Sequence, residues 1–558
     1  MMNNAKKVGI LALSAAMLAG CGGSSSNSKS TTFRFASDTD ILSMDTDVAT
    51  DGTSFDAIHA ITDGLEIFDA KGNTAAGIAK SYDVNKKKTV YTFHLRDANW
   101  VDYNGKKYAK VTANDFVYGW QRILKNAGEY AYMMGSQGAN IKNADKLMEL
   151  GTKATQKQLN TLGVKAKDDK TLVVTLASPV PFFIDLLTFP CYYPVNQKFV
   201  ESKGKEYASS YKDLLSNSAF IMTGWTKGKS ATFVKNKSYW DASKVKLQSM
   251  KWQLGLDAKS AAASFDAGNL DYAPLTSAIV DKYKKSKSYY TYTDGFLHYL
   301  DMNINHYGKN TKSSPTVQKA LKNKNIRKAL SLAINRQELC TKILKDGSTE
   351  SNGFVPKGLC KSPKGVDYRA DVKEDYTSYN LKEAQKAFDK GMKEIGAKSL
   401  TLSVLYGTDE ISMKDVAVYV QSCWSKLKGL KLNMVATVKQ DRVNNREPKG
   451  DFEISVTRWG PDYADPTTYL NLCMTGNAQN RGQWSNKKYD AIMAKVQTES
   501  NLQKRWDLMK KAEKIAMEDY AKIPLFDKGG AALKNTKVKG LVHKSAGVPY
   551  TFEWITMD

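Results

Sequence analysis

The sequence has few of the residues that carry most enzymatic and metal chemistry. Its five histidines are His59, His94, His298, His306 and His543, scattered along 558 residues. The motifs GxSxG and HExxH and the EF-hand calcium loop are all missing. Isolated histidines are more often ordinary surface or core residues than catalytic bases, so the sequence predicts neither an enzyme nor a bound metal or cofactor.

Cysteine is scarce as well, with six residues in the chain. After Cys21 the remaining thiols form an odd set without a CxxC pair: Cys191, Cys340, Cys360, Cys423 and Cys473. This pattern argues against metal ligation. Cys340 and Cys360 lie close in the sequence, so they either form a disulfide or remain buried free thiols.

Long hydrophobic runs are missing beyond the N-terminus. No later run approaches the roughly 18 apolar residues of a membrane-spanning helix. The content of 42% hydrophobic and 25% charged residues predicts a globular body, and the length allows roughly three domains of about 150 residues each. The net charge of +25 comes from dispersed lysines without a nucleic-acid-binding motif. We therefore expect a solvated basic surface and no nucleic-acid partner.

The N-terminus reads as an export signal. Lys6 and Lys7 precede a short apolar segment that ends in "LAGC" at Cys21. This ending matches the bacterial lipobox, in which the cysteine is lipidated and becomes the first residue of the mature protein. We expect residues 1–20 to be a lipoprotein signal peptide and 21–32, with "GGSSSNSKS", to be a flexible tether. The chain would then be lipid-anchored on the extracytoplasmic face of the cell membrane.

The remaining sequence mixes strand and helix patterns. Alternating apolar residues predict strands in "TTFRFAS" (31–37), "TVYTFHLR" (89–96) and "TLVVTLAS" (171–178). Thr112 and Asp115 have capping-box spacing before a helical apolar stripe. A second helix is predicted over 325–344 with Asn325 as its N-cap, and a later helical stretch should stop at Pro524.

Two segments are ambiguous when taken alone. "GWTKGKS" (224–230) resembles a phosphate loop, but its glycine spacing is wrong and a strand pattern follows, so a hairpin turn is the better interpretation. "SVTRWGPDYADPTTYLN" (455–471) places Asp462 and Asp465 in a turn. These carboxylates are either turn chemistry, a ligand site or the acid pair of a hydrolase.

Several segments in shared order resemble the extracellular solute-binding proteins of peptide ABC transporters, the oligopeptide/dipeptide-binding family. The resemblance runs from about Thr32 to Trp554. The resembling segments include "TANDFVYGWQRIL", "TLVVTLASPVPFFIDLLTFPCYYPVNQ", "NIRKALSLAINRQEL" and "FEISVTRWGPDYADPTTYLN", and it is their shared order that is specific.

This resemblance implies an α/β fold with two lobes of the periplasmic-binding-protein type, a two-strand hinge and an additional domain. Domain I (lobe 1) would comprise 33–65, 215–297 and 528–558. Domain II, beside lobe 1, would comprise 66–214, and domain III (lobe 2) would comprise 298–527. Hinged lobes of this kind close over a ligand.

The resemblance also assigns the opening turn. In peptide-binding relatives the Asp of a "W-x-x-D" segment receives the α-ammonium of the peptide, and here that residue is Asp462. The neighbouring Arg458, Trp459, Gly460 and Tyr463 would line one side of the ligand. The loop with Gly52 and Thr53 would line the other side. Asp465 keeps a structural interpretation as a turn or cap residue.

The resemblance implies a monomeric receptor that captures oligopeptides and delivers them to a membrane permease with cytoplasmic ATPases. Dipeptide-selective relatives carry an Arg near the segment matching "SVLYGTDEISMKD". Its absence here favours longer peptides. The alternatives are a non-peptide ligand (a metal chelate, haem or an oligosaccharide), a signalling peptide, or a secreted hydrolase.

Overall fold

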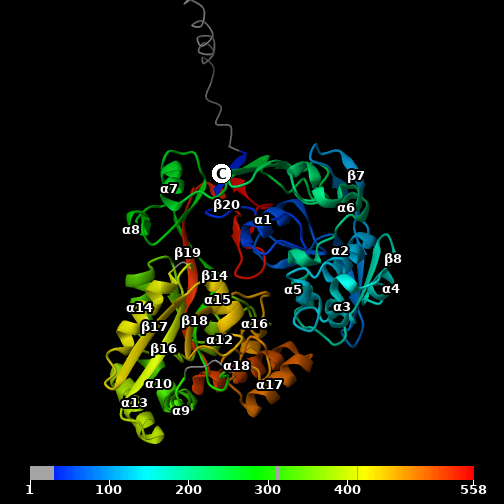
Figure 1. Ribbon diagram of the computed structural model, residues 1–558. Helices are drawn as coiled ribbons and strands as arrows, with labels where there is room; N and C mark the ends of the chain where they lie inside the picture. The colour runs from blue at the N-terminus through cyan, green and yellow to red at the C-terminus, as the bar shows by residue number, and fades with distance from the viewer. Residues whose placement is uncertain (1–30, 309–312, 411) are drawn as a thin grey trace, which may run out of the picture.

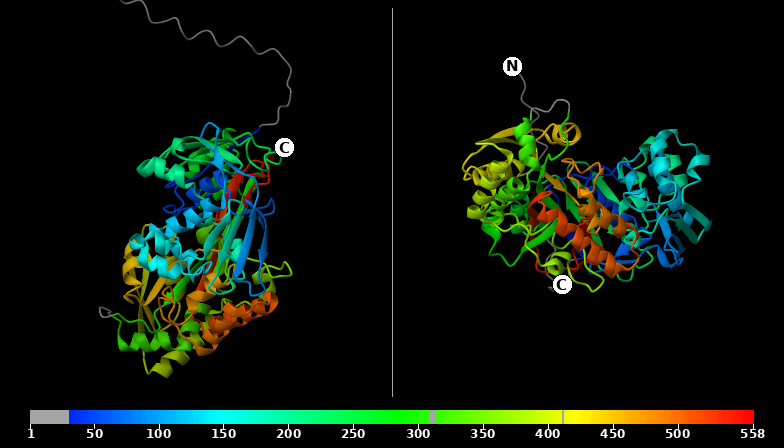
Figure 2. Two further views of the ribbon diagram at one scale, coloured as in Figure 1. Left: turned by 90° about the vertical axis from the view of Figure 1, so that its right-hand side faces the viewer. Right: turned by 90° about the horizontal axis from the view of Figure 1, so that it is seen from below.

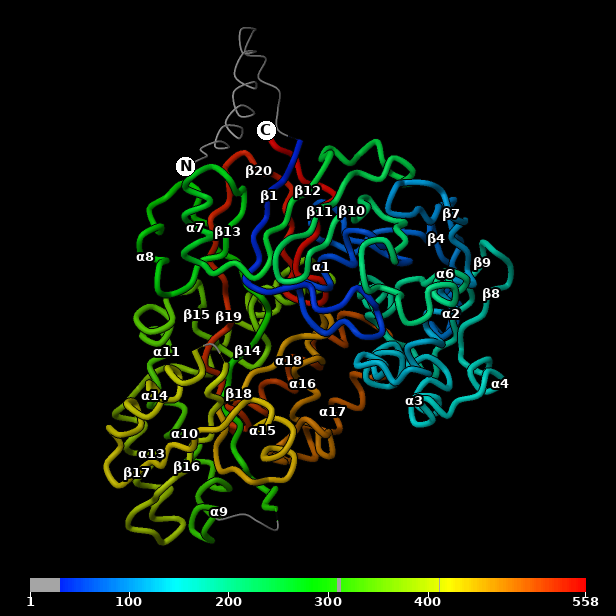
Figure 3. Tube along the Cα trace, turned by 45° about the horizontal axis from the view of Figure 1, so that its top comes forward, coloured from blue at the N-terminus to red at the C-terminus, as the bar shows by residue number. Residues whose placement is uncertain are grey.

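The computed structural model describes residues 31–308, 313–410 and 412–558. The predicted signal peptide and Cys21 lie outside these residues. Within the described part, one eleven-stranded sheet runs through the molecule in the order β10-β11-β12-β1-β13-β19-β14-β18-β16-β17, with β15 paired to β19. Figure 3 shows the two central strands, β14 and β19, passing from the upper to the lower half of the molecule. The predicted α/β class with two lobes, a hinge and an additional domain is confirmed.

Lobe 1 contains one end of this sheet and both ends of the described chain. Its parallel β1–β12 pair runs from Thr32 opposite Ser249 to Ala36 opposite Gln253. The elements are β1 (Thr32–Ala36), α1 (Gly52–Ile61), β10 (Phe220–Thr226), β11 (Ser230–Lys235), β12 (Ser249–Gln253), α7 (Ala258–Asp266), β13 (Tyr272–Leu275), α8 (Val280–Tyr283), β20 (Val538–Lys539), β21 (Val542–His543), β22 (Tyr550–Thr551) and β23 (Thr556–Met557). The β10–β11 hairpin confirms the turn interpretation of 224–230.

The extra domain lies beside lobe 1 (Figure 1, cyan) and is built on a four-stranded sheet in the order β4-β5-β9-β8. Its elements are β2 (Glu66–Phe68), β3 (Thr74–Ala76), β4 (Ala79–Val84), β5 (Val90–Leu95), β6 (Asn99–Val101), β7 (Lys107–Lys110), α2 (Ala113–Lys125), α3 (Ala144–Leu150), α4 (Gln156–Leu159), β8 (Val164–Asp168), β9 (Thr171–Thr175), α5 (Phe183–Leu186) and α6 (Gln197–Lys203). The predicted capping box of α2 is confirmed, with Thr112 and Asp115 bonded reciprocally.

Lobe 2 lies between the hinge strands β14 (Tyr289–Met302) and β19 (Ile523–Lys534) in the chain. The two views in Figure 2 show its helices packed around its part of the sheet. The elements are α9 (Pro315–Lys322), α10 (Lys324–Leu332), α11 (Arg336–Glu338), β15 (Thr349–Glu350), α12 (Tyr368–Val372), α13 (Leu381–Ile395), β16 (Leu400–Gly407), α14 (Met413–Trp424), β17 (Leu430–Thr437), α15 (Lys439–Asp441), β18 (Ile454–Trp459), α16 (Thr467–Leu470), α17 (Lys487–Thr498) and α18 (Leu502–Glu518).

Two helix boundaries predicted from the sequence are wrong. The N-cap of α10 is Asn323, not Asn325, because the Asn323 side chain accepts the backbone N–H groups of Asn325 and Ile326. The last helix ends at Glu518, well before Pro524, which lies inside β19. Pro524 has no N–H to donate, and it is tolerated there because the ladder to β14 is irregular between His298 and Tyr299.

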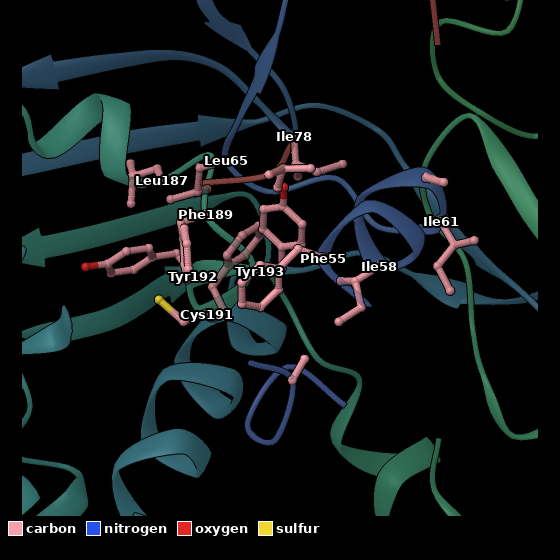
Figure 4. Packing of buried hydrophobic residues seen from close by; sticks show 14 of the residues in the cluster. Phe55, Ile58, Ile61, Leu65, Ile78, Leu187, Phe189, Cys191, Tyr192 and Tyr193 are labelled. Atoms are coloured by element: carbon pink, nitrogen blue, oxygen red, sulfur yellow. The ribbon is translucent and has the colours of Figure 1, made fainter. Parts of the chain in front are cut away.

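The hydrophobic cores show how the parts are joined. One continuous cluster includes buried side chains of both lobe 1 and the extra domain. Figure 4 shows Phe55 of α1 beside Phe189 and Tyr193 of the extra domain. Lobe 2 has a separate cluster that extends from Leu297 to Phe526. The exact domain boundaries given above stay a prediction.

The hinge strands are irregular where they pass between the lobes. The β14–β19 register shifts between Thr293 and Leu297, so residues 294–296 form a bulge. Gly295 in this bulge has φ +79°, and a Cβ there would lie 1.9 Å from the backbone oxygen of Ser545. Only glycine combines this backbone conformation with so close an approach.

Candidate functional site

A cavity of about 550 Å³ lies between the two lobes. Lobe 1 contributes residues 35–39, 50–56 and 543–550, and lobe 2 contributes Trp459 to Asp462. The extra domain adds Tyr130 and Phe189. All three parts of the molecule therefore line one space, the cleft, which is large enough for a small organic ligand.

The end of β18 delivers the 459–462 loop into the cleft. β18 pairs with the hinge strand β14, which sets Trp459 opposite Leu297. The next residue is Gly460, which packs against the ring of Phe296, so that a Cβ there would lie 2.4 Å from the ring and force it to shift. The chain then turns at Pro461 and presents Asp462 to the cavity.

Asp462 is a carboxylate without a cationic partner among the described residues. Its Oδ1 accepts a hydrogen bond from the Tyr132 hydroxyl of the extra domain at 3.1 Å. Burial raises the pKa of the Asp462 carboxyl to about 6, and the hydrogen bond from Tyr132 opposes this rise. A ligand cation in the cleft would offset the cost of desolvating this carboxylate, because the two groups can form a charge-assisted hydrogen bond.

Gly52 and Thr53 lie at the N-terminus of α1 on the facing wall of the cleft. Asp51 caps this helix by accepting from the backbone N–H of Ser54. The Thr53 hydroxyl is already engaged by Thr39 at 2.6 Å. Gly52 also lines the cleft and packs against Pro549.

The remaining predicted residues separate into two environments. Trp459 lines the cleft and also a second cavity of about 430 Å³, and Arg458 lines only this second cavity. Tyr463 lines neither cavity. It is buried, with 6% of its surface exposed, and its ring stacks on Phe182 of the extra domain at 4.3 Å between centroids. The structure thus places Tyr463 in an interdomain contact outside both cavities, and its role as a ligand-lining residue stays a prediction.

Asp465 has the predicted structural role. It accepts hydrogen bonds from the backbone and hydroxyl of Thr467 and forms a buried ion pair with Arg505 at 2.6 Å. Burial alone would raise the pKa of the Asp465 carboxyl, but Arg505 and these hydrogen bonds outweigh it and hold the pKa below its usual range. Asp465 is therefore engaged by Thr467 and Arg505.

Within residues 31–308, 313–410 and 412–558, no cluster of His, Cys, Asp and Glu has the arrangement of a metal site. The same part of the chain contains no helix long and apolar enough to cross a bilayer. Cys340 and Cys360, left open above, are both free thiols.

The matched family model describes bacterial extracellular solute-binding proteins, family 5 (Middle), and covers residues 73–481. The chain belongs to this family. The resemblance inferred from the sequence is thereby confirmed. The names of this family and of the relatives below are names of binding proteins.

Relatives of this family 5 protein match it over nearly their whole lengths. The dipeptide-binding protein of Lactococcus lactis subsp. cremoris is 36% identical, over 98% of each chain. The oligopeptide-binding protein OppA of Bacillus subtilis is 30% identical, over 97% of this chain and 96% of its own. The structure of Listeria monocytogenes OppA bound to peptide has a TM-score of 0.72 and 33% identity, and covers 95% of this chain and 99% of the other.

Sequence reasoning missed most of the aromatic lining of the cleft in this family 5 protein. These side chains come from distant parts of the chain: Phe55, Tyr130, Phe189, Tyr272, Tyr292, Phe296 and Tyr550. It also missed Tyr132, which donates to Asp462. The only local signal was the dense aromatic sequence around them, as in "EYAY" and "YYTYTDGF". Such runs are more often core, so the signal could not have identified a binding site.

Proposed function

We propose that this family 5 protein is an extracytoplasmic receptor that captures peptides in the cleft and delivers them to an ABC importer. The observation that carries the proposal is Asp462, a carboxylate without a cationic partner among the described residues, in a cavity lined by all three parts of the molecule. Every unmodified peptide has an ammonium group at its N-terminus, and its backbone can pair with extended protein chain. The names of the relatives, which include a dipeptide-binding and two oligopeptide-binding proteins, support the same ligand class.

Replacing Asp462 by Asn tests the proposal directly. Loss of a charge-assisted bond costs about 1.5–3 kcal/mol, so peptide affinity should fall by roughly ten- to a hundredfold. Calorimetric titration measures this change, and N-acetylation of the peptide should weaken binding to the unchanged protein by a similar factor.

The matched control is Asp266→Asn, which removes an exposed carboxylate on α7, far from the cleft residues. This variant should bind peptides as well as the unchanged protein. If Asp462→Asn and N-acetylation both leave the affinity unchanged, Asp462 does not receive the ligand ammonium.

The chemical class and length of the ligand are best read from native mass spectrometry of protein isolated from a peptide-rich medium. Retained peptides support the proposal, whereas a metal chelate, haem or sugar would replace it. The missing arginine in 403–415 favours peptides longer than two residues. That expectation stays a prediction, because a dipeptide-binding protein is among the relatives.

The lipid anchor is a separate part of the proposal and rests on the "LAGC" sequence alone. Cys21 would carry the lipid and hold the receptor beside its membrane permease. Replacing Cys21 by Ser should release the protein from the membrane fraction without changing its peptide affinity. Continued membrane association of this variant would argue against anchoring through Cys21.

A further inference from the structure

An open groove of about 490 Å³ lies over α17 and α18, the last two helices of lobe 2. It shares no lining residue with the cleft or with the second cavity. Three lysines line it, Lys495 from α17 and Lys504 and Lys511 from α18, together with Thr498 and Ser500. We call this place, defined by its three lysines, the lysine groove.

The three lysines of the groove are cations without an anionic partner. All three are exposed, and none has a side-chain ion pair or hydrogen bond with a residue that the structure describes. The two carboxylates in the lining are already engaged. Glu499 accepts the backbone N–H of Asn501 at 2.8 Å, and Asp507 is 3.9 Å from the ammonium group of Lys510. The charge that remains available in the groove is therefore positive.

The helix period sets the spacing of these charges. Lys504 and Lys511 are seven residues apart, which is almost two turns, so they lie on one face of α18 with about 10 Å between their positions along the axis. Lys495 lines the same groove from α17. Cations spread along a groove in this way match a ligand that carries several negative charges along its length, more closely than they match one small anion.

A neighbouring groove shows the contrast. It has a volume of about 340 Å³ and shares part of its lining with the lysine groove. Its own lysines are engaged, since Lys510 is paired with Asp371 at 2.9 Å and Lys514 is 3.8 Å from Glu518. Available positive charge is thus concentrated in the lysine groove and not spread evenly along α18.

The turn between β4 and β5 of the extra domain extends this positive surface. Lys88 in the turn donates from its Nζ to the backbone oxygen of Ser500 at 3.3 Å, and Ser500 lines the groove. Lys86 and Lys87 precede it in the same turn, and both are exposed and without an ion pair among the described residues. The contact at Ser500 therefore brings a second group of lysines beside the groove.

The lysine groove lies at the end of the molecule opposite to the beginning of the described chain. Figure 1 shows α17 and α18 at the bottom, with β20 and the blue first strand at the top, and the left view in Figure 2 agrees. A chain anchored through Cys21, as proposed above, presents the groove away from the bilayer. A polymer that extends into the cell envelope can reach the groove in this orientation, whereas a flat membrane surface cannot.

We infer that the lysine groove, continued by the β4–β5 turn, docks a linear polymer of phosphodiesters in the cell envelope. Each phosphodiester carries a negative charge and oxygens that accept hydrogen bonds from lysine ammonium groups and from the hydroxyls of Thr498 and Ser500. The inference goes beyond peptide capture and does not depend on Asp462. Its partner would hold the receptor within the envelope by a contact separate from the cleft and from the lipid anchor.

Calorimetric titration of the full chain with synthetic poly(glycerol phosphate) tests the inference, using the Cys21→Ser variant so that no lipid contributes. Replacing Lys495, Lys504 and Lys511 together by Gln should weaken polymer binding by roughly ten- to a hundredfold. The slope of log affinity against log salt should also become shallower by about two, because each phosphate contact on a single-stranded polyanion contributes roughly 0.7.

The matched control replaces Lys229, Lys251 and Lys259 by Gln. These three lysines of lobe 1 are also exposed, so both triple variants lose the same charge. The control should bind the polymer as the Cys21→Ser protein does. The groove variant should keep its peptide affinity, because the groove shares no lining residue with the cleft, and this measurement shows that the variant is folded.

Selective loss of polymer binding in the groove variant supports the inference. Equal losses in the two triple variants overturn it, as does absence of polymer binding by the Cys21→Ser protein. Stronger binding to phosphatidylglycerol vesicles than to the polymer, with dependence on the same three lysines, also overturns it, because the groove would then be a membrane contact. Peptide titration reports on the proposed function separately, so either proposal can fail alone.

Discussion

Lobe 1 is joined to the extra domain and to lobe 2 in two different ways. With the extra domain it shares a continuous hydrophobic core, which includes α1 and the segment around Tyr193. With lobe 2 it shares two strands, β14 and β19, while lobe 2 keeps its own core. A shared core resists relative motion because separation would expose apolar surface, whereas two strands can bend. The comparison predicts one rigid unit and one hinged lobe.

Across the cleft, lobe 2 touches the extra domain through individual side chains. Tyr132 donates to Asp462, and Phe182 stacks on Tyr463. These contacts can be made and broken as the lobes close and open. Asp462, the proposed ligand-binding carboxylate, therefore lies at the contact between lobe 2 and the extra domain, where we expect movement.

The largest expected effect comes from removing one buried side chain from each of the two cores, in separate variants. Ile58→Ala in α1 and Ile326→Ala in α10 each remove a fully buried side chain, and each should cost about 2–5 kcal/mol of stability. Hydrogen exchange should rise in lobe 1 and the extra domain together for Ile58→Ala. It should rise only in lobe 2 for Ile326→Ala. An Ile58→Ala effect confined to lobe 1 would contradict the shared core.

The hinge itself can be strained at Gly295. Gly295→Ala forces a side chain into a left-handed conformation and against the Ser545 carbonyl, which should cost about 1–3 kcal/mol in the arrangement described here. We expect peptide affinity to fall by roughly ten- to a hundredfold, with a more open shape in small-angle scattering.

Gly228→Ala is the matched control for the hinge variant. Gly228 also has positive φ, but it lies in the β10–β11 turn, where a Cβ would meet nothing within 4 Å. Similar affinity losses in the two variants would mean that the strain acts on general stability and not on the hinge.

Acidification should weaken binding through Asp462. Its carboxyl, with a pKa raised to about 6, is ionised above that pH and becomes protonated as the pH falls through it. Affinity for a free-amino peptide should be full above pH 6 and should fall by up to about tenfold per pH unit below it.

Calorimetry between pH 7.5 and 4.5 measures this loss. Asp294, in the same cleft, has a pKa raised by burial to about 7, so its protonation adds a separate change of affinity with pH. The Asp462→Asn variant keeps the change of affinity that comes from Asp294, but it should not lose affinity near pH 6. An unchanged profile in that variant would show that Asp462 is not the titrating group.

The smallest effect should come from Tyr132→Phe, which removes the hydrogen bond across the moving junction. Loss of about 0.5–1.5 kcal/mol should weaken peptide binding by roughly two- to tenfold. It should also raise the pKa of Asp462 further, so the acid loss of affinity moves to higher pH. Tyr118→Phe, on α2 outside both cavities, is the control and should leave both quantities unchanged.

Local patterns predicted the strands and the capping box of α2. The alternation of apolar residues and the Thr112–Asp115 spacing depend only on residues close in the sequence. The cap of α10 was misplaced since Asn323 and Asn325 are equally good caps by composition. Asp462 could be proposed only through the family resemblance. Its hydrogen bond to Tyr132 joins residues 330 positions apart. No local sequence pattern contains that information.

The order of segments along the chain also determines when each part of the molecule can fold during synthesis. Phe33 near the beginning of β1 packs against Phe552, with 6.3 Å between the ring centroids, and both belong to the core that lobe 1 shares with the extra domain. As the chain is synthesised from its N-terminus, the strands of the extra domain and most of lobe 2 are available earlier. Contacts between such distant segments form slowly and leave apolar surface exposed in the meantime. The core of lobe 1 therefore needs the segment around Phe552 before it can pack fully.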